Sequence, residues 1–212
     1  MRNTAVIELN LFYQHIGDAK AFLRLASAEA SNLKSFYSRH AILSAVFASE
    51  ALINRVYAEF YLGKTDKGLS ESIDRLPFAD KWLLAPLLCG GNSSPGKTFD
   101  RGAQPFQGFR ELIKIRDSLV HPKAGLFVDA EQDGTISLGD GRKEVPYFRV
   151  LPDRHLWPQT GIPKNPFEMN PLHGEKAIHI VEGMIDCLLD LFRGVFDREW
   201  LMRCEFKAKP YW

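Results

Sequence analysis

The sequence predicts a mainly α-helical fold in a single domain, residues 1–212, with a small β and loop insert at residues 125–171 before the last long helix. Apolar residues recur at helical spacing over three long stretches, 37–62, 106–120 and 171–196. The alternating strand and helix units of a parallel sheet are absent from the sequence. With 212 residues, 45% of them hydrophobic, the chain can bury a substantial core.

The first part of the chain is expected to be helical. Residues 9–33 show apolar side chains near helical spacing and predict one helix, or two short ones with Gly17 as the weak point. Residues 37–62 predict the clearest helix of the chain, because apolar side chains surround most of its circumference. Such a helix is expected at the centre of the fold.

Polar residues within that central helix need partners. Glu50 and Asn54 lie one turn apart and therefore share a face. An unpaired buried carboxylate is energetically expensive, so a cross-helix partner such as Arg116 would suit Glu50. Pairing with Arg55 or Arg39, or exposure to solvent, is an equally open alternative.

Two shorter helical segments are expected next. Residues 69–76 predict a short helix with Ser70 as its N-terminal cap. Residues 78–88 are apolar, but Pro86 excludes a central strand and predicts a short or broken helix.

The loop that follows contains a P-loop string. Gly91–Thr98 reads GNSSPGKT and matches the phosphate-binding pattern in full. A true P-loop needs a long helix that starts at its Lys-Thr pair, and Gly102 and Pro105 oppose such a helix. Nucleotide binding through this loop is therefore a third, minor alternative for function.

The insert has a different character from the rest of the chain. Short β-favouring pieces at residues 126–128, 135–138 and 147–150 alternate with the turn signals Asp133-Gly134 and Asp140-Gly141, which predicts a hairpin or a three-stranded meander. Five prolines then predict an extended surface loop over residues 151–171.

The chain is expected to close with a long helix and a tail. Asn170 and Pro171 form a good cap and first-turn pair for a helix that continues to Phe196. The basic and aromatic tail, residues 204–212, suits either base stacking or a latch on the body of the protein, of which the latch is favoured.

The helix at residues 106–120 carries the candidate chemistry. Its solvent-facing side is expected to carry Arg110, Glu111, Lys114 and Asp117, opposite the apolar stripe. Pro122 disfavours helical geometry at the preceding residue, so His121 is expected at the helix end, five residues after Arg116. Arginine can clamp a phosphate with two hydrogen bonds, and histidine can move protons near neutral pH. The alternative is structural, because a cation at a helix C-terminus is favoured by the helix dipole.

Composition limits the other function classes. The net charge of +1 predicts no strong field for nucleic acid or membrane, so RNA binding must rest on a local basic site. Three scattered cysteines, no evident signal peptide and no run of 18 apolar residues predict a cytoplasmic protein outside the membrane. No metal-binding or Gly-x-Ser-x-Gly motif is present, and no cofactor or metal is expected.

This arrangement resembles the HEPN superfamily of helical domains. The resemblance lies first in Arg116-x4-His121 with Asp117 directly after the arginine. It also includes the apolar segment KWLLAPLL followed by PFQGFRELIKIRDSLVHPK, and the helix AVFASEALIN with its inward Glu50. It covers about two thirds of the chain, and the insert at 125–171 departs from the family pattern. The resemblance implies an up-and-down bundle of four to five helices.

The resemblance also implies a function. Catalytic HEPN proteins are metal-independent endoribonucleases whose paired motifs meet across a two-fold dimer interface, as in toxins of toxin–antitoxin systems. It implies a homodimer in which Arg116 clamps phosphate, His121 acts as acid or base, and Asp117, Glu50 and Asn54 orient them. RNA and an antitoxin are the implied partners. The alternative is a non-catalytic HEPN-like dimer that acts as an interaction or scaffold module.

Overall fold

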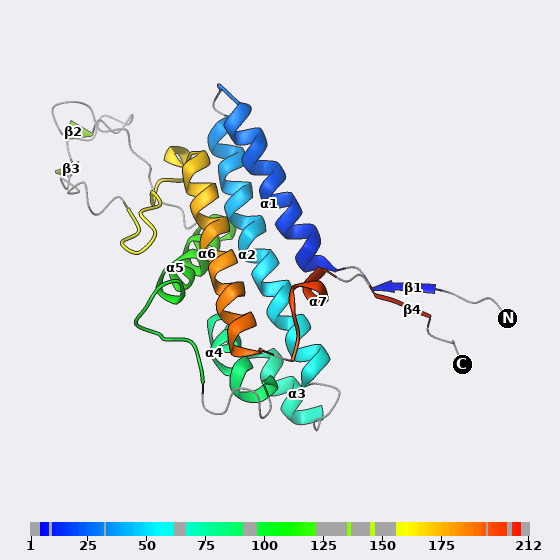
Figure 1. The fold of residues 1–212 in the computed structure, drawn as a ribbon. Coiled ribbons are helices and arrows are strands. Elements are labelled where there is room, and N and C mark those ends of the chain that lie inside the picture. The colour runs from blue at the N-terminus through cyan, green and yellow to red at the C-terminus, as the bar shows by residue number, and fades with distance from the viewer. Residues whose placement is uncertain are drawn as a thin grey trace.

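The structure is a computed structural model that describes residues 5–8, 10–31, 33–61, 67–90, 97–121, 135–136, 145–146, 156–193, 195–202 and 205–208. Within these residues the fold is mainly helical, and the predicted all-α character is confirmed (Figure 1). The α-helices are α1 (Leu11–Ala28), α2 (Leu33–Phe60), α3 (Lys67–Asp74), α4 (Phe78–Cys89), α5 (Phe106–Val120), α6 (Pro171–Leu191) and α7 (Arg198–Met202). The shorter elements are the 3-10 helix η4 (Pro166–Glu168) and the strands β1 (Ala5–Glu8), β2 (Thr135–Ile136), β3 (Val145–Pro146) and β4 (Glu205–Ala208).

Helix α2 lies at the centre of the fold, as its all-round apolar character predicted. It contacts α1, α4, α5 and α6, and α1 and α6 run beside it in Figure 1. Among the described helices, α2 is the one long and apolar enough to cross a membrane by length and composition, but most of that stretch is buried inside the bundle. Burial of this kind is the ordinary property of a core helix.

Helix α1 runs antiparallel to α2, whereas α6 runs parallel to α2. Gly174 near the start of α6 lies against Ala41 near the start of α2, and Phe192 just after α6 lies near Phe60 at the end of α2. Helices α2 and α6 are therefore parallel. Helix α1 runs opposite to both, because its last turns lie beside the first turns of α2 (Figure 1).

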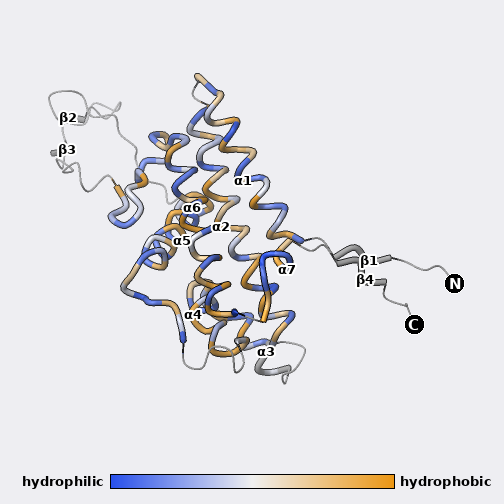
Figure 2. The backbone as a smooth tube through the Cα atoms, in the orientation of Figure 1, coloured by the Kyte–Doolittle hydropathy of each residue, from blue (hydrophilic) through white to orange (hydrophobic). Residues whose placement is uncertain are grey.

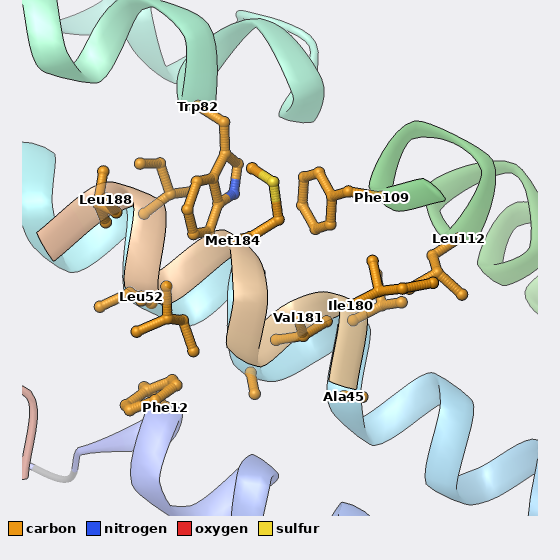
Figure 3. Packing of buried hydrophobic residues seen from close by; sticks show 14 of the residues in the cluster. Phe12, Ala45, Leu52, Trp82, Phe109, Leu112, Ile180, Val181, Met184 and Leu188 are labelled. Carbon is orange, nitrogen blue, oxygen red and sulfur yellow. The ribbon is translucent and has the colours of Figure 1, made fainter. Parts of the chain in front are cut away.

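Three helices meet in the aromatic part of the core (Figure 3). Trp82 of α4 and Phe109 of α5 are fully buried, with ring centroids 5.3 Å apart in an edge-to-face arrangement. Met184 of α6 lies beside both rings in Figure 3 and is also fully buried. In Figure 2 the helices carry both hydrophobic and hydrophilic residues, as expected of helices that cover a shared core.

Helix α5 begins and ends at the predicted residues. Its apolar stripe is confirmed, because Phe109, Leu112 and Ile115 are fully buried. The prediction that Glu111 lies on the solvent-facing side is wrong, because that side chain is only 6% exposed. Helix α5 thus buries one carboxylate together with its apolar face.

Several helix boundaries differ from the prediction. Gly17 does not interrupt α1, which is continuous to Ala28. Ser70 lies inside α3 and is not its cap. Helix α6 ends at Leu191 rather than Phe196. The N–H of Val195 donates to the carbonyl of Phe192 and closes a turn, and Phe192 and Phe196 are both buried there.

Helix α4 is short but unbroken, although Pro86 lies within it. Proline removes a backbone donor from the helix. The hydroxyl of Thr98 donates a hydrogen bond to the carbonyl of Leu83, 3.0 Å away, and supplies a donor in this turn of the helix. The loop after α4 is thereby joined to it.

The structure adds a pairing that the sequence did not predict. Strand β1 near the N-terminus pairs antiparallel with β4 in the tail, Ala5 opposite Ala208 and Glu8 opposite Glu205. In the insert, β2 pairs with β3 over two residues each. The other predicted strands of the meander, near residues 126–128 and 147–150, lie outside the described residues.

The segment before α6 is more buried than the predicted surface loop. Trp157 and Ile162 close a tight turn, in which the Trp157 amide donates to the Ile162 carbonyl at 2.8 Å. Gly161 within it has φ +62°, a conformation that favours glycine. Thr160 and Ile162 are fully buried, so this turn packs into the body of the protein.

Candidate functional site

Arg116 is the centre of the candidate site. One of its terminal nitrogens lies 3.3 Å from Oε2 of Glu50 on α2, and the other lies 3.0 Å from Oδ1 of Asp117. Its side chain is 18% exposed, that of Glu50 39% and that of Asp117 55%. The structure therefore joins Arg116 to Glu50, which was the first of the partners considered from the sequence.

The remaining surface of the guanidinium faces the protein interior. Its central carbon lies 6.0 Å from the ring centroid of Phe78, at the start of α4. Its Nε is buried and has no hydrogen-bond partner among the described residues. Three helices thus fix the position of this cation: α5 carries it, α2 supplies an acid and α4 supplies an aromatic ring.

His121 lies where the sequence placed it, at the C-terminal cap of α5. Its backbone N–H donates to the carbonyl of Asp117 at 2.9 Å, which completes the last helical turn. Its side chain is exposed and makes no hydrogen bond or ion pair with a described residue. Five residues turn an ideal helix by about 140°, so Arg116 and His121 of one chain leave α5 in different directions.

Asn54 is not brought to Arg116. Its Oδ1 accepts a hydrogen bond from Nζ of Lys81 on α4, at 3.0 Å, and both groups are near the surface. Of the five residues predicted for the site, the structure therefore joins Glu50, Arg116 and Asp117 directly, and leaves the side chains of Asn54 and His121 apart from them.

The described part of the P-loop string lacks the required helix. Residues 97–105 are not helical, and the next helix is α5 at Phe106. The hydroxyl of Thr98, which would hold a magnesium ion in a P-loop, is bonded to the Leu83 carbonyl. Residues 91–96 lie outside the described residues.

Glu111 is a buried acid that the sequence reasoning assigned to solvent. Its Oε2 accepts hydrogen bonds from the backbone N–H groups of Gln159 at 2.9 Å and Thr160 at 2.6 Å. The two bonds satisfy both backbone donors of the turn. This residue holds the turn at 157–162 against α5, one and a half turns before Arg116.

Two further histidines in the described part of the chain, His173 and His179, lie on α6. His173 accepts a hydrogen bond at Nδ1 from the Asn170 N–H, 3.0 Å away, and completes the capping box of α6. His179 is exposed, and His155 lies outside the described residues. Within the described residues, no three His, Cys, Asp or Glu side chains lie close enough to hold a metal ion.

A second polar feature was not predicted from the sequence. Arg39 and Phe36 of α2 share a groove with Phe167 of η4, at the end of the bundle where α2 and α6 begin. Phe167 is far in sequence from Phe36 and Arg39, and no motif connects them.

No protein-family model matches the chain, and no curated protein or solved structure is significantly similar to it. The function is therefore inferred from the side chains and contacts described above.

Proposed function

We propose that the chain is a cytoplasmic, homodimeric, HEPN-like protein that cleaves RNA without a metal ion. The observation that supports the proposal best is the contact between Arg116 on α5 and Glu50 on α2, at 3.3 Å. This contact links the two segments on which the resemblance rests. The helical bundle with a small β-hairpin insert at residues 125–171 belongs to the same proposal, as does a role as a toxin with an antitoxin partner or in RNA processing and defence.

His121 carries the proton transfer in the proposed reaction. As base, its imidazole takes the proton of a ribose 2′-hydroxyl, and the 2′-oxygen attacks the neighbouring phosphorus. The bond to the 5′-oxygen breaks, and this leaving oxygen receives a proton from an imidazolium. The products are a 2′,3′-cyclic phosphate and a 5′-hydroxyl, and no metal takes part.

Arg116 stabilises the charge that develops on the phosphorane oxygens. Its two terminal nitrogens already contact Glu50 and Asp117, so a phosphate must displace one of these carboxylates. Asp117 is the more exposed of the two and is the acid that moves aside. Glu50 and the ring of Phe78 then keep the guanidinium in place.

A two-fold dimer can bring Arg116 and His121 into one site, although the two side chains point in different directions within one chain. Because Arg116 and His121 diverge on α5, a site with both groups is completed by the second chain. An isologous interface repeats each contact, so it forms two equivalent sites, each with Arg116 of one chain and His121 of the other.

The test is cleavage of single-stranded RNA by the purified protein in excess chelator. Wild type is expected to give fragments with 2′,3′-cyclic phosphate ends, and His121→Ala is expected to lose at least 99% of the rate, since general acid–base catalysis contributes roughly a hundredfold or more. His179→Ala is the matched control, because His179 is also exposed and lies on α6. Absence of cleavage of any RNA by wild-type dimer contradicts the proposal.

A mixing experiment tests the dimeric site. Arg116→Ala and His121→Ala proteins are each expected to be inactive, but subunit exchange between them creates one site with both groups intact if the groups come from different chains. Partial recovery of activity on mixing is the expected result. No recovery, with exchange verified by labelled subunits, places both groups in one chain.

The second candidate is a non-catalytic HEPN-like dimer that serves as an interaction module. The observation that favours it is the full engagement of the Arg116 terminal nitrogens with Glu50 and Asp117, which makes a structural role sufficient. It predicts that Arg116→Ala lowers stability or dimerisation, and that neither this variant nor wild type alters RNA.

A further inference from the structure

A groove of about 730 Å³ lies at the end of the bundle where α2 and α6 begin. Lys34, Phe36 and Arg39 line it from the first two turns of α2, and Phe167, Glu168 and Asn170 line it from η4 and the cap of α6. We name it the α2–η4 groove. Its volume falls within the range of about 300–1,000 Å³ that is typical of small-ligand sites.

The groove contains one cation for which no carboxylate partner is seen. Among the described residues Arg39 makes no ion pair, whereas Lys34, which also lines the groove, interacts electrostatically with Glu29. The guanidinium of Arg39 lies over the ring of Phe167, 5.3 Å from its centroid. Glu168 is the acid that lines the groove, and its Oε1 accepts a hydrogen bond from the Asn165 side chain at 2.9 Å.

The groove also exposes two aromatic rings. Phe167 is 65% exposed and Phe36 is 40% exposed. Phe36 is held in place by His40 in the next turn of α2, with ring centroids 4.1 Å apart. His40 itself is fixed by a hydrogen bond of 2.8 Å between its Nδ1 and the Phe36 carbonyl. The two rings and the guanidinium above Phe167 are flat surfaces on which a nucleobase can stack.

We infer that the α2–η4 groove binds single-stranded RNA, with a base stacked on Phe167 or Phe36 and the adjoining phosphate bound by Arg39. A cation together with exposed aromatic rings is the combination that binds single strands, because each nucleotide carries both a planar base and a negative charge. The identification of the ligand as RNA rests on the proposed function, whereas the stacking of a base and the binding of a phosphate are argued from the groove itself.

The position of the groove relative to Arg116 supports a shared ligand. Arg39 and Glu50 are eleven residues apart on α2, which corresponds to about 16 Å along the axis and a rotation of only about 20°. The groove therefore lies on the same side of α2 as the Glu50–Arg116 pair. A strand held in the groove can run along this side of α2 towards Arg116.

The test uses a fluorescently labelled 2′-O-methyl RNA hexamer, which lacks the attacking hydroxyl and cannot be cleaved. Its dissociation constant is measured by anisotropy with wild type, Arg39→Ala and Phe167→Ala. Each substitution is expected to weaken binding by about tenfold, the size of one lost stacking or phosphate contact. Glu168→Gln is expected to strengthen binding, because it removes the negative charge from the groove. Tyr13→Ala and Arg24→Ala, exposed residues of α1, are the matched controls and are expected to bind as wild type.

The outcomes separate this inference from the proposed function. Binding by wild type, with loss in the groove variants, supports the groove even if no RNA is ever cleaved. Equal affinity of all variants, or no binding by wild type at low salt, overturns the inference. Displacement of the hexamer by an acidic, phenylalanine-containing peptide at lower concentration than unlabelled RNA also overturns it, because the groove would then be a peptide site.

Discussion

Oε2 of Glu111 on α5 lies 2.6 Å from the backbone nitrogen of Thr160 and also accepts from the neighbouring Gln159. A single buried carboxylate thus satisfies two backbone donors of a turn that is distant in sequence. Buried donors without partners are costly, so the turn and α5 depend on each other.

Removing this carboxylate is expected to destabilise the fold. Glu111→Ala leaves two N–H groups unpaired and is expected to lower the free energy of unfolding by about 2–6 kcal/mol, at about 1–3 kcal/mol for each donor. Urea unfolding measures the loss, and hydrogen exchange at Gln159 and Thr160 is expected to accelerate. Glu175→Ala, on the exposed face of α6, is the control and is expected to change stability by less than about 0.5 kcal/mol. Equal urea midpoints for Glu111→Ala and wild type would contradict the prediction.

The burial of Glu111 shows why sequence periodicity predicted α5 correctly but one of its residues wrongly. The apolar spacing and Pro122 fix the two ends of the helix, and both agree with the structure. The same pattern assigns every acid to solvent, because it contains no information about backbone N–H groups of a remote turn. Every residue except proline carries a backbone N–H group, so no residue type in the sequence indicates which of these groups Glu111 will bind.

The other contacts near the candidate site also differ in how far the sequence could predict them. The contact of Glu50 with Arg116 was among the alternatives open from the sequence, because a central helix with an inward acid needs a cation from a neighbouring helix. The binding of Asn54 to Lys81 was not foreseen, since it depends on where α4 crosses α2. The pairing of β1 with β4 joins the two ends of the chain, and no turn signal connects them.

The Glu50–Arg116 pair is expected to stabilise the packing of α2 on α5. A double-mutant cycle with Glu50→Gln and Arg116→Met is expected to give a coupling energy of about 1 kcal/mol, between the value of an exposed ion pair and that of a charged hydrogen bond. Asp117→Asn is the matched comparison, and its coupling to Arg116 is expected to be smaller because Asp117 is more exposed. A coupling energy near zero for the Glu50 pair in urea unfolding would show that the two groups do not stabilise the fold together.

Two glycines of the helical body are expected to respond in opposite directions to the same substitution. Gly17 on α1 is exposed, and an added Cβ meets nothing within 4 Å. Gly17→Ala is therefore expected to raise the free energy of unfolding by about 0.5–1 kcal/mol through helix propensity.

Gly174 on α6 allows close contact with α2. An added Cβ lies 3.2 Å from Cβ of Ala41 and 3.6 Å from the Ser38 carbonyl oxygen, so the two helices must separate. Overpacking costs about 1–3 kcal/mol and outweighs the gain in propensity, so Gly174→Ala is expected to be less stable than wild type by roughly 1 kcal/mol. Thermal or urea unfolding of the two variants side by side checks both signs, and a stabilised Gly174→Ala would show that α6 is not held so close to α2.

The stability of the start of α6 is expected to depend on pH through His173. Its Nδ1 accepts the Asn170 N–H and must therefore carry a free lone pair. Burial, together with the nearby charge of Lys176, lowers the pKa of His173 below its usual value. The unfolded chain then binds a proton more readily than the folded one, so the free energy of unfolding falls as the pH decreases through about 6.5 and continues to fall until the lowered pKa of the folded state is passed.

Comparing variants isolates this contribution. His173→Ala is expected to be less stable than wild type at pH 7.5 by roughly 0.5–1 kcal/mol, the value of a lost capping interaction. The difference is expected to shrink as the pH falls towards 5, because wild type loses the same hydrogen bond when Nδ1 is protonated. His179→Ala, on the exposed side of the same helix, is expected to keep the wild-type pH dependence. An NMR titration that gives His173 a pKa at or above 6.5 in the folded protein would refute the mechanism, since a free lone pair at Nδ1 would then not be favoured.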